Sequence, residues 1–172
     1  MAELKGLNEL NRKMTEALSA FNVRAEAADD FAYYWEQELV TFPVVAYNSD
    51  GDNFLEEFIK DRFGFVHIDH FVALLLHEVG HHLANEETDE GAVADFCWEE
   101  KERIEQELRE CAEDDYEAKK RLHYQYYNLP EELMATQWAA NYIKENPLAV
   151  NKLICACESA LYEFYEKNEI RG

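Results

Sequence analysis

The chain has 172 residues, enough for one domain with a real core, and 48% of them are apolar. The formal net charge is −21, because 37 acidic residues outnumber 16 basic ones. Such a charge disfavours binding to nucleic acid, which needs clustered Lys and Arg, and leaves DNA mimicry as the one nucleic-acid role. We see neither a signal peptide nor an apolar run long enough to span a bilayer, so we expect a cytoplasmic protein without membrane contact.

The first part of the chain is predicted to contain two helices and a strand. Apolar residues at intervals of three and four predict a helix over residues 2–22, and a second helix follows at about 25–38. Residues 39–47 are rich in β-formers, and residues 48–52 have the composition of a turn. Because Pro43 removes one backbone donor, we place this strand at a sheet edge or at a bulge.

The next segment leads into the most informative stretch of the sequence. We expect a short helix over residues 54–62, followed at 63–67 by a second short strand or a turn. Asp69 is a candidate cap for a helix over residues 70–85. This helix has an apolar first half and ends in a cluster of histidines.

The second half of the chain is predicted to be helical and begins with a strongly acidic segment. After the loop NEETDEG, residues 92–128 are expected to form one long helix or two broken ones. Between residues 86 and 121 there are 15 acids and 6 bases, a local net charge of −9, so we interpret residues 86–128 as an acidic, solvated helical insertion. Pro130 suits the first position of a helix reaching about residue 145, and a last helix covers 147–167. We see no linker that would divide the chain, and predict one domain over 1–172.

The four cysteines are expected to be free thiols. They are Cys97, Cys111, Cys155 and Cys157. Disulfides are rare in the cytosol, and the spacing Cys155-Ala156-Cys157 does not match a CxxC redox or zinc pair.

The stretch His77-Glu78-Val79-Gly80-His81 fits the pattern HExxH. On a helix, His77 and His81 lie one turn apart and within about 40° of each other, so both imidazoles can bind one cation. Glu78 is offset from them and can accept a proton from a water on that cation, whose pKa zinc lowers toward about 7. The alternative is a helix end that simply meets solvent.

A catalytic zinc site needs a third protein ligand and an open position. The pattern HExxHxxGxxH fails here, because its last two diagnostic positions are Ala84 and Glu87. Glu132 is a candidate, because the small residues that follow it on the same helical face would let that helix cross closely at Gly80. A first-turn acid favoured by the helix dipole is the alternative interpretation of Glu132.

The sequence HEVGHH followed by ExxAxxWAA resembles the gluzincin-type metallopeptidases, in particular the small ImmA/IrrE-like group. The match covers residues 77–82 and 132–140, with Trp138 where phenylalanine is common. The resemblance implies a zincin-like α+β fold that is mostly helical, with a minimal sheet before the HExxH helix. It also implies a Zn²⁺ held by His77, His81 and Glu132, with Glu78 as general base and Glu131 as the fallback ligand.

Residues before the Glu132 helix are candidates for stabilising an oxyanion. We favour His123 and Tyr127 as catalytic residues, with Tyr124 and Tyr126 as further candidates, although tyrosines this dense usually serve packing. We do not expect the other histidines near the motif to bind the metal. We expect His82 to support the site or lie at the surface, and we expect His67 and His70 to be structural.

The leading hypothesis is therefore a small zinc-dependent peptidase acting on a peptide or protein substrate. The strand over 40–47 is either an edge to which an extended peptide adds or an internal strand. The charge of −21 motivates a different hypothesis, an acidic interaction protein with a structural or vestigial metal site. A metal-dependent hydrolase of non-peptide substrates is the third, since the same water chemistry serves other carbonyl compounds.

Overall fold

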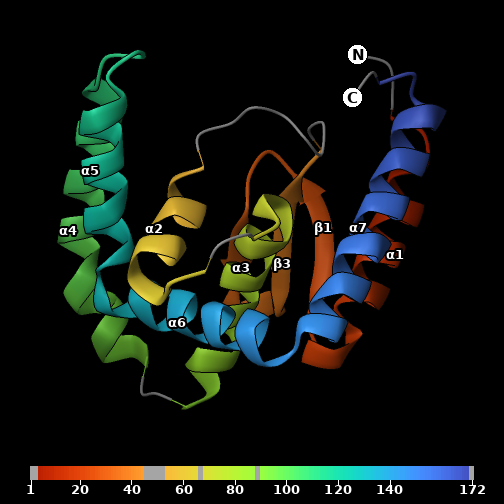
Figure 1. Cartoon of the computed structure of the whole chain (residues 1–172), viewed down its shortest axis with the longest axis horizontal. Helices are drawn as coiled ribbons and strands as arrows, with labels where there is room; N and C mark the ends of the chain where they lie inside the picture. The colour runs from red at the N-terminus through yellow and green to blue at the C-terminus, as the bar shows by residue number, and fades with distance from the viewer. Residues whose placement is uncertain (1–3, 45–52, 66–67, 88–89, 171–172) are drawn as a thin grey trace.

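A computed structural model describes residues 4–44, 53–65, 68–87 and 90–170, with side chains 85–87 and 90–96 left out of the description. These residues form an α+β structure that is mostly helical and contains a small sheet (Figure 1). In Figure 1, one helix pair flanks each side of the molecule, and the sheet and α3 lie between the pairs.

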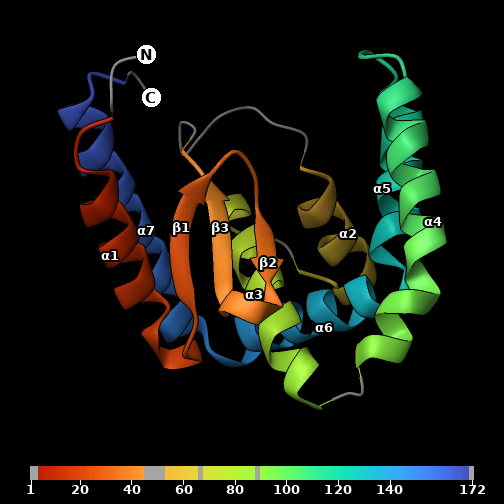
Figure 2. The ribbon, with the colours of Figure 1, turned by 180° about the vertical axis from the view of Figure 1, so that it is seen from behind.

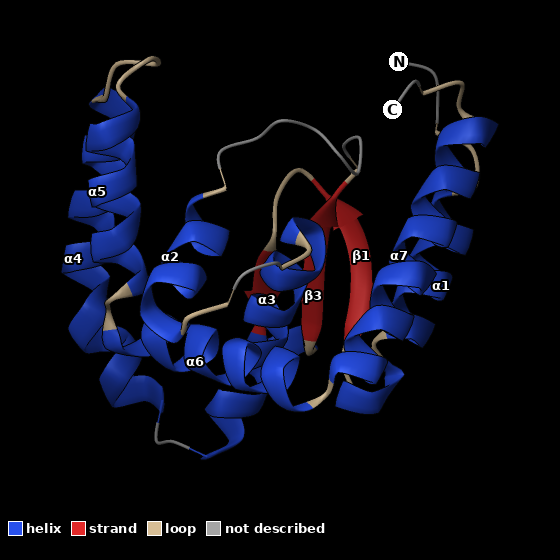
Figure 3. Ribbon diagram, viewed as in Figure 1, coloured by secondary structure: helices blue, strands red, loops and turns tan. Residues whose placement is uncertain are grey.

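The sheet, drawn in red in Figure 3, has three strands in the order β1-β3-β2, and all three are labelled in Figure 2. β1 (Arg24–Ala28) runs parallel to β3 (Leu39–Pro43), and β2 (Ala32–Tyr34) runs antiparallel to it. The predicted helix at 25–38 was therefore wrong. Its alanines favour a helix locally, but backbone pairing with β3 overrides that preference, and only the turn Trp35–Gln37 is helical, as a 3₁₀ segment.

The predicted strand exists, but its placement at a sheet edge was wrong. β3 is the central strand of the sheet, and all of its residues are buried. Pro43 is tolerated because it is the last residue of β3, opposite Ala28, and not an interior position. The predicted second strand at 63–67 is not found over its described part, since Phe63 ends α2 and Gly64 caps that helix. Val66 and His67, and the predicted turn at 48–52, lie outside the described residues.

The first and last helices pack together on one side of the sheet. α1 (Leu7–Ala17) is shorter than the predicted 2–22 and is followed by a 3₁₀ turn at Ser19–Phe21. It packs against β1 and against α7 (Pro147–Lys167). The apolar core lies between these helices, α3 and the sheet, and its fully buried members include Met14, Phe42, Leu75 and Leu161.

Two crossing helices form the centre of the molecule. α3 (His70–Glu87) begins after the predicted cap, where Asp69 Oδ1 accepts a hydrogen bond from the Val72 amide at 2.8 Å. α6 (Pro130–Glu145) crosses it so closely that a Cβ added at Gly80 would lie 2.4 Å from the Ala135 carbonyl oxygen. The close approach predicted from the small residues is confirmed. We call this contact the α3–α6 seam.

The predicted acidic insertion is a pair of helices with a break between them. α4 (Glu90–Glu110) and α5 (Tyr116–Tyr127) pack against each other, and Asp115 caps α5 by accepting from the Ala118 amide. α2 (Phe54–Phe63) lies between α5 and the seam. We call α4 and α5 the acidic hairpin. Within the described part of the chain, no helix has both the length and the apolar character needed to cross a membrane.

Candidate metal centre

Three side chains from the α3–α6 seam converge on one point. His77 Nε2 lies 3.0 Å from Glu132 Oε2, His81 Nε2 lies 3.2 Å from the same oxygen, and the two Nε2 atoms are 3.2 Å apart. All three residues are buried. The third ligand predicted from the sequence therefore does lie beside the two imidazoles.

The three atoms form a nearly equilateral triangle with the dimensions of a metal site. Ligand atoms about 2.0–2.1 Å from a tetrahedral zinc ion lie about 3.3 Å from one another. The observed separations of 3.0–3.2 Å are close to that spacing. Two imidazole nitrogens and one carboxylate oxygen also form a donor set that divalent zinc binds. The buried group can hold a metal ion.

The sequence produces this triangle through helix periodicity and a close helix crossing. His77 and His81 are one turn apart on α3 and project from the same face. Glu132 is in the first turn of α6, and Gly80 lets α6 approach until backbone meets backbone at Ala135. A larger residue at position 80 would separate the helices and move Glu132 away from the imidazoles.

Thr136 orients the first imidazole and was not assigned this role from the sequence. Its hydroxyl donates to the Glu132 carbonyl at 2.8 Å, which leaves the oxygen lone pairs to accept from His77 Nδ1 at 3.0 Å. Nδ1 thus keeps its proton, and Nε2 is the nitrogen that would give up its proton to bind a cation at the triangle. Thr136 follows Glu132 by four residues, so its position on the same helical face was the available signal.

The two neighbouring glutamates of α6 occupy different positions around the cluster. Only Glu132 reaches the two Nε2 atoms, whereas Glu131 Oε1 lies 3.9 Å from Nδ1 of His81. Burial alone would raise the pKa of Glu132, but the charge of His81 and hydrogen bonds from both imidazoles hold that pKa well below its usual range. Glu132 is thus the carboxylate that would bind a cation, and Glu131 is its neighbour.

Glu78 is a buried carboxyl beside this cluster. Its burial raises its pKa to about 7, because desolvation outweighs the attraction of His77. The negative charge of Glu132 contributes to this rise. A carboxyl with a pKa near neutrality can accept and return a proton, which is the property required of a general base and acid.

The aromatic residues of α5 that were predicted to be catalytic lie at different distances from the cluster. Tyr127 is close, with its ring 5.9 Å from that of His77, and burial raises its pKa. His123 lies further out, because its ring stacks between Phe54 at 4.6 Å and Tyr127 at 6.1 Å. Tyr124 donates to Asp61 on α2, which makes it a link between α2 and α5.

Tyr126 also faces the cluster. Burial, with the nearby charge of Glu132 and a hydrogen bond to it, raises the pKa of this phenol. Tyr126 therefore contacts a ligand residue, and Tyr127 contacts an imidazole.

Two further histidines, His82 and His70, lie near the motif in the described part of the chain. His82 is buried, and its Nδ1 lies 2.8 Å from the Tyr33 hydroxyl, which links α3 to strand β2 (Figure 2). This contact is compatible with the prediction that His82 supports the site. The burial of His82 contradicts the alternative prediction of a surface location. His70 begins α3, and its buried Nδ1 has no hydrogen-bond partner among the described residues. His67 lies outside the described residues.

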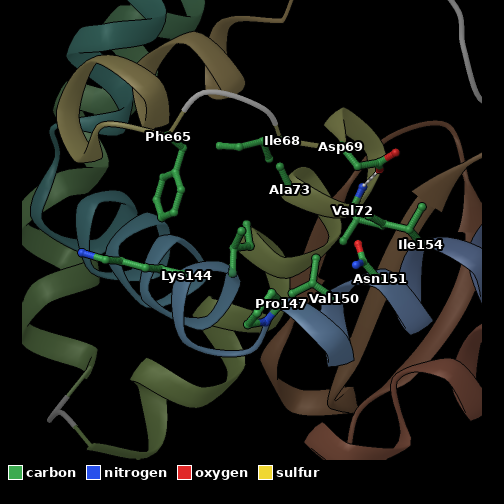
Figure 4. A pocket seen from close by; sticks show the side chains of 11 residues that line it. Phe65, Ile68, Asp69, Val72, Ala73, Lys144, Pro147, Val150, Asn151 and Ile154 are labelled. Atoms are coloured by element: carbon green, nitrogen blue, oxygen red, sulfur yellow. Dashed lines mark hydrogen bonds between the residues drawn. The ribbon is translucent and has the colours of Figure 1, made fainter.

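A cavity of about 320 Å³ lies at the other end of the seam (Figure 4). Its lining is mostly apolar and includes Phe65, Val72, Ala73, Ile143, Val150 and Ile154. None of the metal-cluster residues lines it, and Ile143 is 11 residues beyond Glu132 on α6. The cavity and the metal cluster are separate features.

Comparison with known proteins gives no family model, no curated protein and no solved structure that matches this chain.

Proposed function

We propose that the protein is a zinc-dependent peptidase with a zincin-like fold, as its resemblance to ImmA/IrrE-like gluzincins implies. The observation that carries the proposal is the triangle formed by His77 Nε2, His81 Nε2 and Glu132 Oε2. A structural zinc site normally uses four protein ligands, whereas a catalytic one uses three and keeps a fourth position open. The cluster has three such ligands among the described residues.

A zinc ion in this site would supply Lewis acidity and make an attacking water more acidic. The general base is Glu78, which follows the first ligand directly and lies buried beside it. Glu78 accepts the proton of the water and delivers it to the leaving amine. Burial raises the pKa of this carboxyl, which favours its uptake of the proton from the water.

Tyr127 is the residue that we assign to stabilising the developing oxyanion. Its ring contacts His77, and a phenol with a raised pKa stays protonated and can donate a hydrogen bond. His123 stacks on Tyr127 and is better placed to hold that ring than to reach a substrate. Tyr126 is the second donor near the site, because it interacts with Glu132.

The strand that would bind an extended substrate is β2 and not β3. β2 is an edge strand, and it is tied to the HExxH helix by the contact between Tyr33 and His82. An extended peptide that pairs with the outer edge of β2 would run beside α3. The prediction from Pro43 that residues 40–47 offer this edge no longer applies, because β3 is paired with a strand on both sides.

Metal analysis tests the ligand set. We expect about one zinc ion per chain in the purified wild-type protein, and loss of that zinc in His77→Ala and in Glu132→Ala. Glu131→Ala is the matched control and should keep its zinc, since Glu131 does not reach the Nε2 atoms. Zinc that persists in Glu132→Ala would contradict the assignment.

Hydrolysis of a quenched fluorescent peptide library tests the reaction. Glu78→Gln should lower the rate of peptide cleavage by more than about 100-fold, while zinc content and the circular dichroism spectrum stay unchanged. A nearby conservative change outside the cluster, Glu99→Gln on the exposed part of α4, should leave the rate unchanged.

The acidic surface favours one alternative, an interaction protein in which the metal is structural. The exposed acids of α4 include Glu99, Glu100, Glu102, Glu105 and Glu110. In that case function would survive Glu78→Gln and fail when the acids from Glu99 to Glu117 are neutralised. Cleavage of esters or amides but not of peptides would instead indicate a metal-dependent hydrolase of other substrates.

A further inference from the structure

Lys101 reaches the metal cluster from the acidic hairpin. Its Nζ lies 2.7 Å from Oε1 of Glu132 and 2.9 Å from Oε2 of Glu131. The same ammonium lies 5.6 Å from the centre of the Tyr126 ring. Among the described residues, Lys101 is the only Lys or Arg that forms an ion pair with Glu132.

The contact is selective for one oxygen of the carboxylate. Glu132 Oε2 faces both imidazoles, and Oε1 faces Lys101. The Lys101 side chain is 18% exposed and that of Glu132 is 3% exposed, so water competes little for this pair. The two oxygens of one carboxylate therefore have different, fixed partners.

The other cations of α4 behave differently. Arg103 pairs with Glu100 and Glu107, its neighbours on the same helix, and Arg109 lies 4.0 Å from Glu105. All of these side chains are at least 44% exposed. Lys101 alone among these three leaves its own helix for a partner on α6.

We propose that Lys101 is a positioning residue that makes Glu132 a one-oxygen ligand of the metal. By holding Oε1, Lys101 prevents the carboxylate from turning to present both oxygens to the cation. The cluster then keeps an open coordination position, which catalysis requires. This inference rests on the proposed metal centre, and it does not depend on whether the substrate is a peptide.

The inference also gives the acidic hairpin a role in the site. Groups that hydrogen-bond to a ligating carboxylate commonly fix its orientation and affect metal affinity. Here that group comes from α4, whereas all three ligands come from α3 and α6. The hairpin thus completes the surroundings of the metal.

The test uses Co²⁺ in place of zinc, because zinc has no visible spectrum and cobalt reports its coordination number. We expect intense visible bands of four-coordinate Co²⁺ in the wild-type protein. Lys101→Met should lose most of that intensity, as a second carboxylate oxygen joins the cobalt ion. Its zinc dissociation constant, measured by competition with a chelator, should fall about tenfold, because a second oxygen ligand and the loss of a nearby positive charge both favour the zinc ion.

Two variants control for charge and for side-chain length. Arg109→Met removes the same charge from α4 without touching the cluster, so its cobalt spectrum should equal that of the wild-type protein. Lys101→Arg keeps a cation beside Glu132 and should restore most of the intensity. A spectrum and a zinc affinity unchanged in Lys101→Met would overturn the inference and leave Lys101 a role in stability alone.

A second variant keeps the test informative if Lys101→Met does not fold. Lys101→Met leaves Glu131 and Glu132 without their cation, so the double variant Lys101→Met/Glu131→Gln removes one of these charges and is measured in the same way. If the wild-type protein binds neither cobalt nor zinc, the metal centre and this inference both fail. If it binds cobalt as expected and cleaves no peptide, only the peptidase proposal fails.

Discussion

The α3–α6 seam and the acidic hairpin both contain many ionisable side chains. The metal-cluster residues of the seam are buried, whereas the Arg–Glu pairs along α4 are exposed. In the seam, each of His77, His81 and Glu132 is buried and has defined partners. In the hairpin, Arg103 and its glutamate partners are exposed neighbours on one helix. Exposed pairs of this kind contribute little to stability, while buried groups without partners are costly. Charge density is therefore a poor guide to a candidate site, whereas burial with convergent geometry indicates one.

The largest expected effect comes from the metal. A zinc ion bound to the folded seam should stabilise it by about 2.7 kcal/mol when free zinc exceeds the dissociation constant 100-fold. We expect a chelator to lower the thermal midpoint accordingly, and Glu132→Gln to abolish the response to zinc. Glu100→Gln in the hairpin should keep the full increase of the thermal midpoint with zinc. Loss of that increase in this variant would contradict the assignment of the metal to the seam alone.

The next effect concerns the close crossing of the seam. Gly80→Ala gains about 1 kcal/mol of helix propensity, but its methyl group would lie 2.4 Å from the Ala135 carbonyl oxygen. Backbone cannot move aside as a flexible side chain does, so we expect a net loss of about 2 kcal/mol in urea unfolding. Gly64→Ala is the comparison, since nothing lies within 4 Å and only its positive φ of 78° opposes the change. Its loss should be about 1 kcal/mol.

A smaller effect follows from Thr136. Thr136→Val keeps the shape of the side chain but removes the oxygen that accepts from His77 Nδ1. The imidazole then loses its orienting partner, and we expect zinc affinity to fall about tenfold in chelator competition. Thr136→Ser retains the hydroxyl and should bind zinc as the wild-type protein does. Equal affinities for the Val and Ser variants would show that the hydrogen bond does not orient His77.

The smallest effect is expected in the hairpin. A hydrogen bond from Arg103, together with its charge, holds the pKa of Glu100 below its ordinary 4.5. The folded pKa is depressed, so the pair stabilises the protein above about pH 4.5 and loses its effect as the pH falls below that value. Arg103→Met should therefore lower the thermal midpoint slightly at pH 7, and this effect should diminish as the pH falls below 4.5. A large decrease at pH 7 would show that the exposed pairs of the hairpin contribute as much to stability as the buried groups of the seam.

The sequence predicted the seam well because its signals are local or repeat along one helix face. The four-residue spacing of His77 and His81 fixes their direction, and the small residues Gly80 and Ala135 indicate a close crossing. Glu132 could be selected because it shares a face with those small residues, a choice that the resemblance supported.

The sheet and the role of Lys101 were not predictable in the same way. The alanines of β1 favour a helix, and only pairing with β3 residues 15 positions further along the chain makes them a strand. Pro43 pointed to an edge because the sequence does not reveal that it closes the strand. Lys101 is one of several bases among many acids on α4, and its partner lies 31 positions further along the chain.

The seam also bears on the order of events in folding. His77 and Glu132 are separated by 55 positions, and in the hairpin that lies between them α4 packs against α5 and Ile104 and Leu122 are buried. Closing so long a loop is entropically cheaper once its middle is already compact. We expect the hairpin to form early and the three ligands to meet late, so that metal capture becomes the step that commits the chain to its native arrangement.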